Sequence, residues 1–394
     1  MASIEDSGLP LVFEVANPID ELPGGAPPGT DHTSIRTTVR ALTGMQKEAV
    51  VALGPDGVAW RLVSDEGPYL NGTDLAPFPL AFFAAGMQFC FMSEVLRAAG
   101  RHDVTFESVV LDVDNRYSME GSFLRGDARG GAFPPELTLS VVSDAAADRV
   151  AQVVAEAAAR CPAQSLVREV LTNTFSYTVD GDPVEVDGLP RPVGPVATYR
   201  EELFDGLRPV SEPSPPVIEK LKAAEVVEGV EGGAGSSLAA EQKRTLHVRS
   251  RGEWTGALRM RCDVHLLKPI GSSFRFRSDE TPDRGGTGEA PPPLAYLTAG
   301  VGFCFMTQLG RYAHIVKRPL GSYAIVQDNT FDVAEAAPKP GPTETHVFVE
   351  AGPAGVAPDL VTVGERTCFL HAAMRTKVPG VIETRLNGEA LPLA

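Results

Sequence analysis

The feature that most constrains how this chain can fold is an internal repeat. The segment AAGMQFCFM at residues 84–92 is nearly repeated by TAGVGFCFM at residues 298–306, and Cys90 and Cys304 are 214 positions apart (304 minus 90). Self-similarity at a fixed spacing is the signature of a repeated structural unit, so we expect two copies of one fold. The same offset relates Arg61 to Arg275, Ser64-Asp65-Glu66 to Ser278-Asp279-Glu280, Pro79-Leu80-Ala81 to Pro293-Leu294-Ala295, and Asp114-Asn115 to Asp328-Asn329.

The second copy is shorter than the first. Cys161 and Cys368 are 207 positions apart (368 minus 161), which is seven fewer than the offset of the first cysteine pair. We place the missing residues in the loop sequence SMEGSFLRGDARGG at residues 118–131. Four of the five cysteines therefore have a counterpart at the equivalent position, and Cys262, which has none, is interpreted as an ordinary strand residue.

Both copies show the same order of predicted elements. Strand-like runs come first, and a proline-opened apolar helix then carries the first cysteine of each copy. In the first copy a second helix is expected to begin at a Ser143 cap and to place Val150, Val153, Val154, Ala157 and Cys161 on one face. The predicted strands cover residues 34–42, 48–53, 58–64, 104–117 and 136–143 in the first copy and residues 244–250, 257–267 and 272–278 in the second.

The region between the copies has the composition of a linker. It is rich in proline at its start and contains the flexible sequence EGGAGSS at residues 231–237, with a short helix expected over residues 216–227. The predicted organisation is an N-terminal tail at residues 1–30, a first domain at 31–200, a linker at 201–243 and a second domain at 244–394.

The composition argues against several classes of function. Hydrophobic residues make up 43% of the 394 residues, which is enough to build two domain cores. The net charge of −16, with no stripe of Lys and Arg, argues against binding to nucleic acid or to anionic membrane surfaces. The acidic N-terminal segment lacks the features of a signal peptide, and five cysteines are too few for a disulfide framework. We therefore expect a cytoplasmic protein.

The layout of strands, cysteine helix, strands and a helix ending in Cys-Pro resembles the OsmC/Ohr family of bacterial thiol peroxidases, and is closest to its organic hydroperoxide resistance branch. FPLAFFAAGMQFCF at residues 78–91 fits the family's cysteine-helix signature without a gap. CPAQSLVR fits the second signature with Arg168 seven residues after Cys161, whereas CFLHAAMR keeps Arg375 but has Phe369 in place of the proline. The resemblance implies an α+β fold of two OsmC/Ohr-like domains. Because family members form intertwined homodimers, it also implies an intramolecular pseudo-dimer.

The resemblance further implies a peroxidase chemistry. Cys90 and Cys304 would attack a peroxide oxygen and become sulfenic acids, and Cys161 and Cys368 would condense with them to disulfides. An external dithiol or lipoyl-type reductant would reopen each disulfide. The attacking thiol must be ionised, and in the family an arginine held by a glutamate supplies the necessary positive charge.

The sequence departs from the family in the residues that supply this positive charge. The family glutamate corresponds to Leu80 and Leu294, and neither copy has the family's Gly-Gly-Arg turn. We consider two arginine pairs as substitutes, Arg40 with Arg249 and Arg168 with Arg375. Arg97 and Arg311 lie seven residues beyond the cysteines on the same helix, about 10 Å away along the axis, which is a poor distance for direct contact.

These departures leave two further classes of function open. One is a different thiol-dependent enzyme that acts on an electrophilic or sulfur-containing metabolite, and the other is a non-catalytic protein that binds an apolar small molecule. No bound cofactor and no metal site are predicted, because the seven histidines lack metal-ligand spacing and no Gly-rich phosphate loop is present. His371 is expected to be a surface or core residue. The expected partners are a small-molecule substrate and a thiol reductant, and pairing with a second copy of the chain, beyond the internal pairing, is left open.

The constant 214-residue offset generates a prediction about assembly. If the two copies pair with each other, the protein should have a mass near 41.8 kDa in light scattering. Two copies splayed apart, each pairing with another chain, would instead give at least twice that mass.

Overall fold

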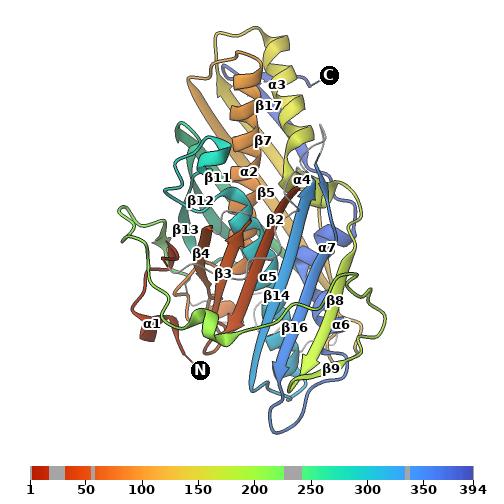
Figure 1. Cartoon of the computed structure of the whole chain (residues 1–394). Coiled ribbons are helices and arrows are strands. Elements are labelled where there is room, and N and C mark those ends of the chain that lie inside the picture. Colours follow the sequence, from red (N-terminus) through yellow and green to blue (C-terminus); the bar gives the residue numbers. More distant parts are fainter. Residues whose placement is uncertain (1, 17–31, 55–57, 226–241, 333–337, 394) are drawn as a thin grey trace.

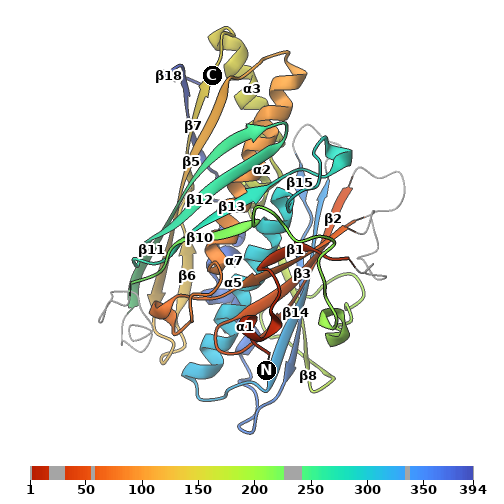
Figure 2. The same cartoon turned by 90° about the vertical axis from the view of Figure 1, so that its left-hand side faces the viewer.

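In the part of the chain that the structure describes, two nine-stranded sheets form the framework, and the long helices lie between them (Figures 1 and 2). The computed structural model describes residues 2–16, 32–54, 58–225, 242–332 and 338–393. This mixed architecture of helices and sheets is consistent with the α+β class predicted from the sequence.

The first sheet has the strand order β1-β4-β3-β2-β14-β16-β8-β9, with β15 paired to β14. Its strands from the N-terminal half are β1 (Val12–Glu14), β2 (His32–Ala41), β3 (Lys47–Leu53), β4 (Val58–Ser64), β8 (Asn173–Val179) and β9 (Asp182–Val184). Its strands from the C-terminal half are β14 (Ser322–Asp332), β15 (Lys339–Pro340) and β16 (Thr343–Glu350).

The second sheet has the strand order β10-β13-β12-β11-β5-β7-β17-β18, with β6 paired to β5. Its first four strands and its last two are β10 (Ile218–Lys222), β13 (Ser273–Ser278), β12 (Arg259–Lys268), β11 (Gln242–Gly256), β17 (Val381–Leu386) and β18 (Glu389–Leu391). The strands between them come from the N-terminal half and are β5 (Ser108–Gly121), β6 (Arg129–Ala132) and β7 (Glu136–Val142).

The two sheets are equivalent position by position, with the two halves of the sequence exchanged. β2 pairs with β14 at the centre of the first sheet, and β11 pairs with β5 at the centre of the second. Both pairings are antiparallel, whereas β16–β8 and β17–β7 are parallel. Each half of the sequence therefore completes its sheet with strands from the other half, so neither sheet is built from one copy alone.

The segments assigned to the N-terminal tail and to the linker each contribute an edge strand. β1 pairs with β4 and β10 pairs with β13, at equivalent positions of the two sheets. The helix expected over residues 216–227 is therefore wrong, because its described part forms β10, where pairing with the edge of the sheet outweighs local helix preference. The Gly/Ser-rich part of the linker and residues 17–30 of the tail lie outside the described residues.

Seven α-helices occur in the described part of the chain. They are α1 (Ile4–Ser7), α2 (Pro79–Arg101), α3 (Ala147–Arg160), α4 (Pro162–Arg168), α5 (Pro293–Ile315), α6 (Leu360–Thr367) and α7 (Phe369–Arg375). The proline-opened cysteine helices are thus confirmed as α2 and α5, and the strands predicted in both copies match β2 to β5, β7 and β11 to β13.

The start of α3 differs from the prediction. The helix is preceded by Ala146, which has no side chain to cap it. The Ser143 hydroxyl instead accepts a hydrogen bond from the Ala145 N–H at 3.1 Å and donates one to the Thr105 carbonyl at 2.6 Å. Ser143 therefore stabilises the turn that leads into the helix. A serine hydroxyl can form hydrogen bonds with nearby backbone groups in a turn as well as at a helix cap.

The two long helices α2 and α5 pack directly against each other at the centre of the molecule (Figure 2). A Cβ atom on Gly86 would lie 2.5 Å from the Leu297 nitrogen, and one on Gly300 would lie 2.6 Å from the Phe83 nitrogen. Glycine at both positions thus allows backbone contact between the helices. By length and composition α2 could cross a membrane, but 94% of its most apolar window is buried inside the protein, which explains its apolar character.

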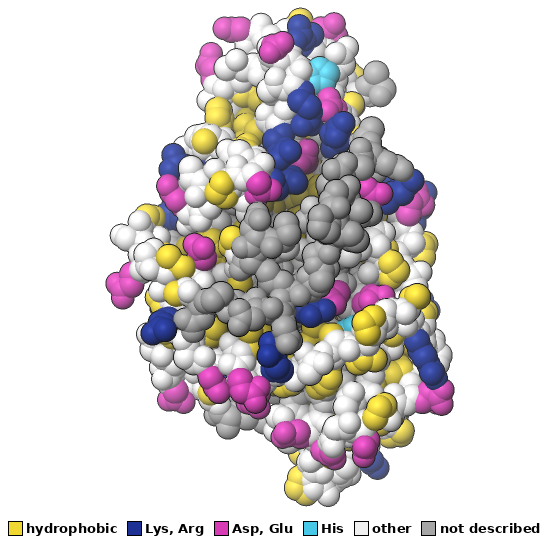
Figure 3. All heavy atoms as spheres, viewed as in Figure 1, with side chains coloured by type: hydrophobic (Ala, Val, Ile, Leu, Met, Phe, Trp, Pro, Cys, Tyr) yellow, Lys and Arg dark blue, Asp and Glu magenta, His cyan; other side chains and the backbone are white. Residues whose placement is uncertain are grey.

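The surface carries both signs of charge. Figure 3 shows acidic and basic side chains interspersed over the visible face, with hydrophobic side chains between them. Some surface charges form exposed ion pairs, such as Lys377 with Glu169 at 2.8 Å. Such pairs contribute little to stability.

The helix crossing generates a prediction about stability. Gly86→Ala and Gly300→Ala should each lower the free energy of unfolding by about 1–3 kcal/mol, because the added methyl group forces the two backbones apart. Denaturant unfolding measures this change. The matched control is Gly100→Ala in the same helix α2, where a Cβ meets nothing within 4 Å and alanine should stabilise by about 0.5 kcal/mol. Equal effects at Gly86 and Gly100 would contradict the close crossing.

Candidate functional site

Cys90 and Cys161 form one dithiol centre. Cys90 is the twelfth residue of α2, and Cys161 lies in extended backbone (φ −71°, ψ 115°) between α3 and α4. Their sulfur atoms are 3.4 Å apart, and the Ala163 N–H donates a hydrogen bond to the Cys90 Sγ at 3.4 Å. The turn between α3 and α4 therefore brings the second thiol onto the cysteine helix.

Cys304 and Cys368 form an equivalent second centre. Cys304 lies in α5, Cys368 lies between α6 and α7, and their sulfur atoms are also 3.4 Å apart. The backbone at Cys368 (φ −70°, ψ 124°) nearly equals that at Cys161, although Phe369 follows it in place of a proline. The broken Cys-Pro signature thus leaves the local geometry unchanged. All five cysteines are free and buried, and Cys262 lies on β12 as predicted.

Burial disfavours the ionised form of one thiol in each centre, Cys90 in the first and Cys368 in the second. Burial is the largest cause that raises the pKa of Cys90 well above its ordinary value, followed by the hydrogen bond with Cys161. The Ala163 N–H opposes the rise, and the charge of Glu94 adds to it. Burial likewise raises the pKa of Cys368, against backbone hydrogen bonds from Leu370 and His371. A reactive thiolate therefore needs nearby positive charge.

Each centre includes a glutamate from the other half of the chain, which the sequence reasoning missed. Thr307, three residues after Cys304, donates a hydrogen bond to Glu66 at 3.0 Å. Ser93, three residues after Cys90, donates one to Glu280 at 2.5 Å. Residues three apart lie on the same face of a helix, so each glutamate lies on the cysteine face of its helix. The repeated Ser-Asp-Glu segment was the available signal.

Two equivalent loops, one from each half of the chain, present Glu66 and Glu280. The Asp65 carboxylate accepts hydrogen bonds from the N–H groups of Thr73 and Leu75 at 3.0 and 3.1 Å. In the second copy Asp279 accepts from Thr287 and Glu289 at 2.9 and 3.1 Å. The aspartate therefore folds the loop, and the glutamate that follows it points to the partner helix.

The first pair of candidate arginines is engaged away from the sulfur atoms. Arg40 donates to Glu48 at 2.8 and 3.0 Å, and Arg249 donates to both oxygens of Asp114 at 3.0 Å. The sheet register shows that these two residues are not equivalent. The counterpart of Arg249 is Arg36, which holds Asp328 in the same bidentate way at 2.7 and 2.8 Å. Treating Arg40 as the counterpart of Arg249 was therefore wrong by four residues.

The second pair of candidate arginines holds the turns that carry Cys161 and Cys368. Arg168 donates to the carbonyls of Ala158 and Ala159 at the end of α3, at 2.6 and 3.2 Å. Arg375 donates to the carbonyls of Glu365 and Arg366 at the end of α6, both at 2.9 Å. These contacts satisfy helix C-terminal carbonyls and so position the second cysteine. A direct catalytic role of the four candidate arginines stays a prediction.

Other cations act on the thiols. The charges of Lys47 and Arg311 interact with Cys304, and the charge of Arg284 interacts with Cys90. Arg311 belongs to the pair whose seven-residue spacing argues against direct contact, and its buried guanidinium group interacts with Cys304 through its charge. Lys47 and Arg284 were not considered from the sequence. Among the residues that the structure describes, no group of three His, Cys, Asp or Glu could hold a metal ion.

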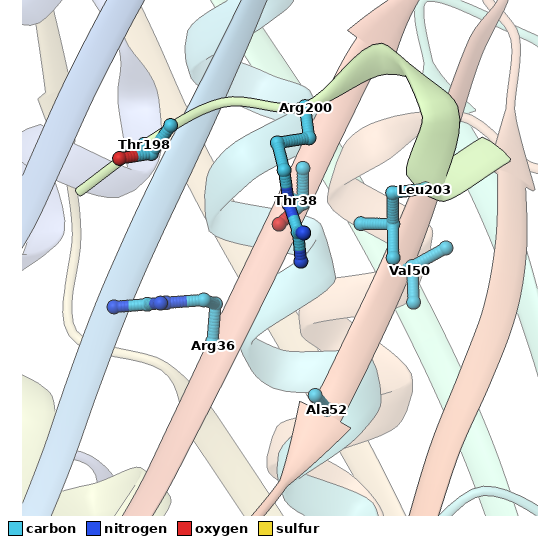
Figure 4. Close-up of a pocket in the computed structure, with 7 residues that line it drawn as sticks. All are labelled: Arg36, Thr38, Val50, Ala52, Thr198, Arg200 and Leu203. Atoms are coloured by element: carbon cyan, nitrogen blue, oxygen red, sulfur yellow. The ribbon is translucent and has the colours of Figure 1, made fainter. Parts of the chain in front are cut away.

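A surface pocket lies apart from both centres (Figure 4). It lies where the segment at residues 198–203 crosses β2 and β3, and its lining residues are Arg36, Thr38, Val50, Ala52, Thr198, Arg200 and Leu203. Thr37 bonds to Thr298 of α5 at 3.1 Å, and successive strand residues face opposite sides. The pocket therefore lies on the outer face of the first sheet, away from the cysteine helices.

Comparison with known proteins adds a family match. The family model described as OsmC-like protein matches residues 72–174. A solved crystal structure of an OsmC-like hydroperoxide resistance protein from Jannaschia sp. CCS1 matches at 20% sequence identity with a TM-score of 0.26, over 39% of this chain and 98% of that chain. No curated protein matches this chain. The chain thus contains an OsmC-like domain at residues 72–174, as the sequence resemblance implied.

His371 generates a prediction about the pH dependence of stability. It is fully buried between Phe175 and Phe305, and burial lowers its pKa to about 3. Below about pH 6.5 the His371 imidazole becomes protonated in the unfolded chain but stays neutral in the folded chain. This histidine therefore lowers the free energy of unfolding as the pH falls from about 6.5 to about 3. The loss amounts to about 2 kcal/mol at pH 5.

The variant His371→Gln tests this effect, because Gln164 occupies the equivalent position of the first copy. Denaturant unfolding between pH 7 and pH 4 should show a shallower fall for the variant than for the natural chain. His314→Gln at an exposed position of α5 is the control and should keep the natural slope. Parallel curves for all three proteins would exclude the effect.

Proposed function

We propose that this chain, which contains an OsmC-like domain, is a thiol-dependent peroxidase that reduces organic hydroperoxides through a Cys–Cys disulfide cycle. The observation that carries the proposal is the pair of dithiol centres with sulfur atoms 3.4 Å apart in both halves. A disulfide bond is about 2.05 Å long, so each pair closes by a small movement. The match of residues 72–174 to the OsmC-like family adds support.

The chemistry proceeds in three balanced steps. A thiolate of Cys90 or Cys304 attacks the distal oxygen of the hydroperoxide, the O–O bond breaks, and the products are a sulfenic acid and an alcohol. The thiol of Cys161 or Cys368 then attacks the sulfenic sulfur, forms the disulfide and releases water. An external dithiol reduces the disulfide and becomes oxidised itself.

The surroundings of the thiols favour an apolar substrate. Cys90 and Cys304 belong to the hydrophobic core that includes Phe89, Phe91 and Phe303. Burial there excludes water, which favours the organic part of an alkyl hydroperoxide over hydrogen peroxide. Arg284 at Cys90 and Lys47 and Arg311 at Cys304 would stabilise the thiolate, in the role that the family assigns to a single arginine.

We further propose that the chain is a tandem duplication whose halves pair as the two subunits of an intertwined dimer would. The exchange of strands between the sheets and the Ser93–Glu280 and Thr307–Glu66 contacts support this interpretation. A cytoplasmic location and a lipoyl-type reductant belong to the same proposal.

Peptide mapping after oxidation tests the proposed function. One equivalent of cumene hydroperoxide per dithiol should produce disulfides within the two centres, and Cys262 should remain free. Cys262→Ser should keep full peroxidase activity, whereas the double variant Cys90→Ser/Cys304→Ser should lose it. Hydrogen peroxide should react more slowly than the organic peroxide. Turnover that survives the double variant would refute the proposal, and thiols that do not react at all would favour the ligand-binding alternative.

A further inference from the structure

The two dithiol centres have the same sulfur geometry but different surroundings. The sheet registers identify equivalent positions without reference to sequence similarity. Lys47 pairs with Ser64 in the first sheet, and Met260 pairs with Ser278 in the second. Ser64 and Ser278 bond to equivalent proline carbonyls at 2.8 Å. Lys47 therefore occupies, beside Cys304, the position that Met260 occupies in the other centre.

Lys47 is a fully buried cation. Its side chain is 0% exposed, and its ammonium group donates to the Met45 carbonyl at 2.6 Å. Burial lowers its pKa, and the charges of Glu66, Asp65 and Cys304 oppose that shift. A buried lysine is costly unless it interacts with negative charge. A thiolate at Cys304 would add to the negative charge that offsets this cost.

A second difference is a tyrosine on β5. Tyr117 is 2% exposed, and its hydroxyl is buried without a hydrogen-bond partner. Its ring packs against Phe369, and its phenol group interacts electrostatically with both Cys304 and Cys368. At the equivalent position of β14 the other centre has Phe331, since Tyr117 pairs with Leu246 and Phe331 with Thr33. A buried unpaired hydroxyl is unfavourable and is therefore a candidate to bind a substrate oxygen.

A third difference is the balance of charge on the cysteine helices. Glu94 follows Cys90 by one turn, and the equivalent residue after Cys304 is Gln308. Glu94 and Glu280 both lie 3.2 Å from Arg284, and Glu94 also lies 3.7 Å from Arg97 and 3.8 Å from Arg101. In the other centre Glu66 has the charges of Lys47 and Arg311 nearby. The Cys90 centre therefore carries the charge of a carboxylate, Glu94, where the Cys304 centre has the neutral amide of Gln308.

From these three differences we infer that the Cys304–Cys368 centre is the faster peroxide-reducing centre, and that Tyr117 is a catalytic residue in it. This inference rests on the proposed peroxidase function. The Tyr117 hydroxyl donates a hydrogen bond to the alkoxide oxygen that forms as the O–O bond breaks. Lys47 stabilises the attacking thiolate of Cys304. Across the step the thiol S–H and peroxide O–O bonds break, an S–O bond and an alcohol O–H bond form, and sulfur is oxidised to a sulfenic acid.

The order of oxidation tests this inference within a single molecule. The natural chain is mixed with substoichiometric cumene hydroperoxide, quenched by alkylation at successive times and mapped by mass spectrometry. The Cys304–Cys368 disulfide should form at least about tenfold faster than the Cys90–Cys161 disulfide. Equal rates, or faster formation at Cys90, would overturn the inference and leave the proposed function intact. If no disulfide forms in either centre, the proposed function itself fails.

Three variants test the roles of individual residues. Tyr117→Phe copies the natural residue at position 331 and should slow Cys304 oxidation about tenfold with the Cys90 rate unchanged. Lys47→Met copies the natural residue at position 260 and should also slow only Cys304. Phe331→Tyr is the control and should leave the Cys304 rate unchanged. Because both centres lie in one chain, damage to the fold would slow both disulfides together, whereas loss of a catalytic group slows one. Unchanged Cys304 oxidation in Tyr117→Phe would refute the role of this residue.

Discussion

The structure depends on the contact between α2 and α5. Gly86 and Gly300 allow the two backbones to touch, and a Cβ on either would approach the partner backbone within about 2.6 Å. Cys90 and Cys304 each follow their glycine by four residues, which is one helical turn. The contact between α2 and α5 therefore fixes the positions of both thiols relative to the helix crossing. It also places the face of each cysteine helix within reach of a loop from the other half of the chain.

Each centre is consequently composite. The cysteines of one centre come from one half of the sequence, and the glutamate that bonds to the cysteine helix comes from the other half. The sheets follow the same rule, since their central pairings β2–β14 and β11–β5 join strands from different halves. Neither half contains a complete sheet or a complete centre, so folding of the halves and assembly of the sites are one process.

Because both centres lie in one chain, they can also differ. Two identical subunits would carry the same residue at both equivalent positions, and a buried lysine would then be required twice. In this single chain the position equivalent to Lys47 is Met260, and the position equivalent to Tyr117 is Phe331. The cost of burying a cation or an unpaired hydroxyl is then borne at one centre only. Arg168 and Arg375, by contrast, hold equivalent helix ends, because both second cysteines need the same turn.

The sequence by itself determined the cysteine helices and most of the strands, because periodicity and proline positions are local properties of the chain. It could not reveal β10, whose short segment becomes a strand only beside β13. It also could not assign the partners of Arg40 and Arg249 or the contacts of Glu66 and Glu280, because these depend on strand register and on approach between residues far apart in sequence. The tertiary structure alone decided which half supplies which group to each thiol, since only packing across the α2–α5 crossing brings those groups together.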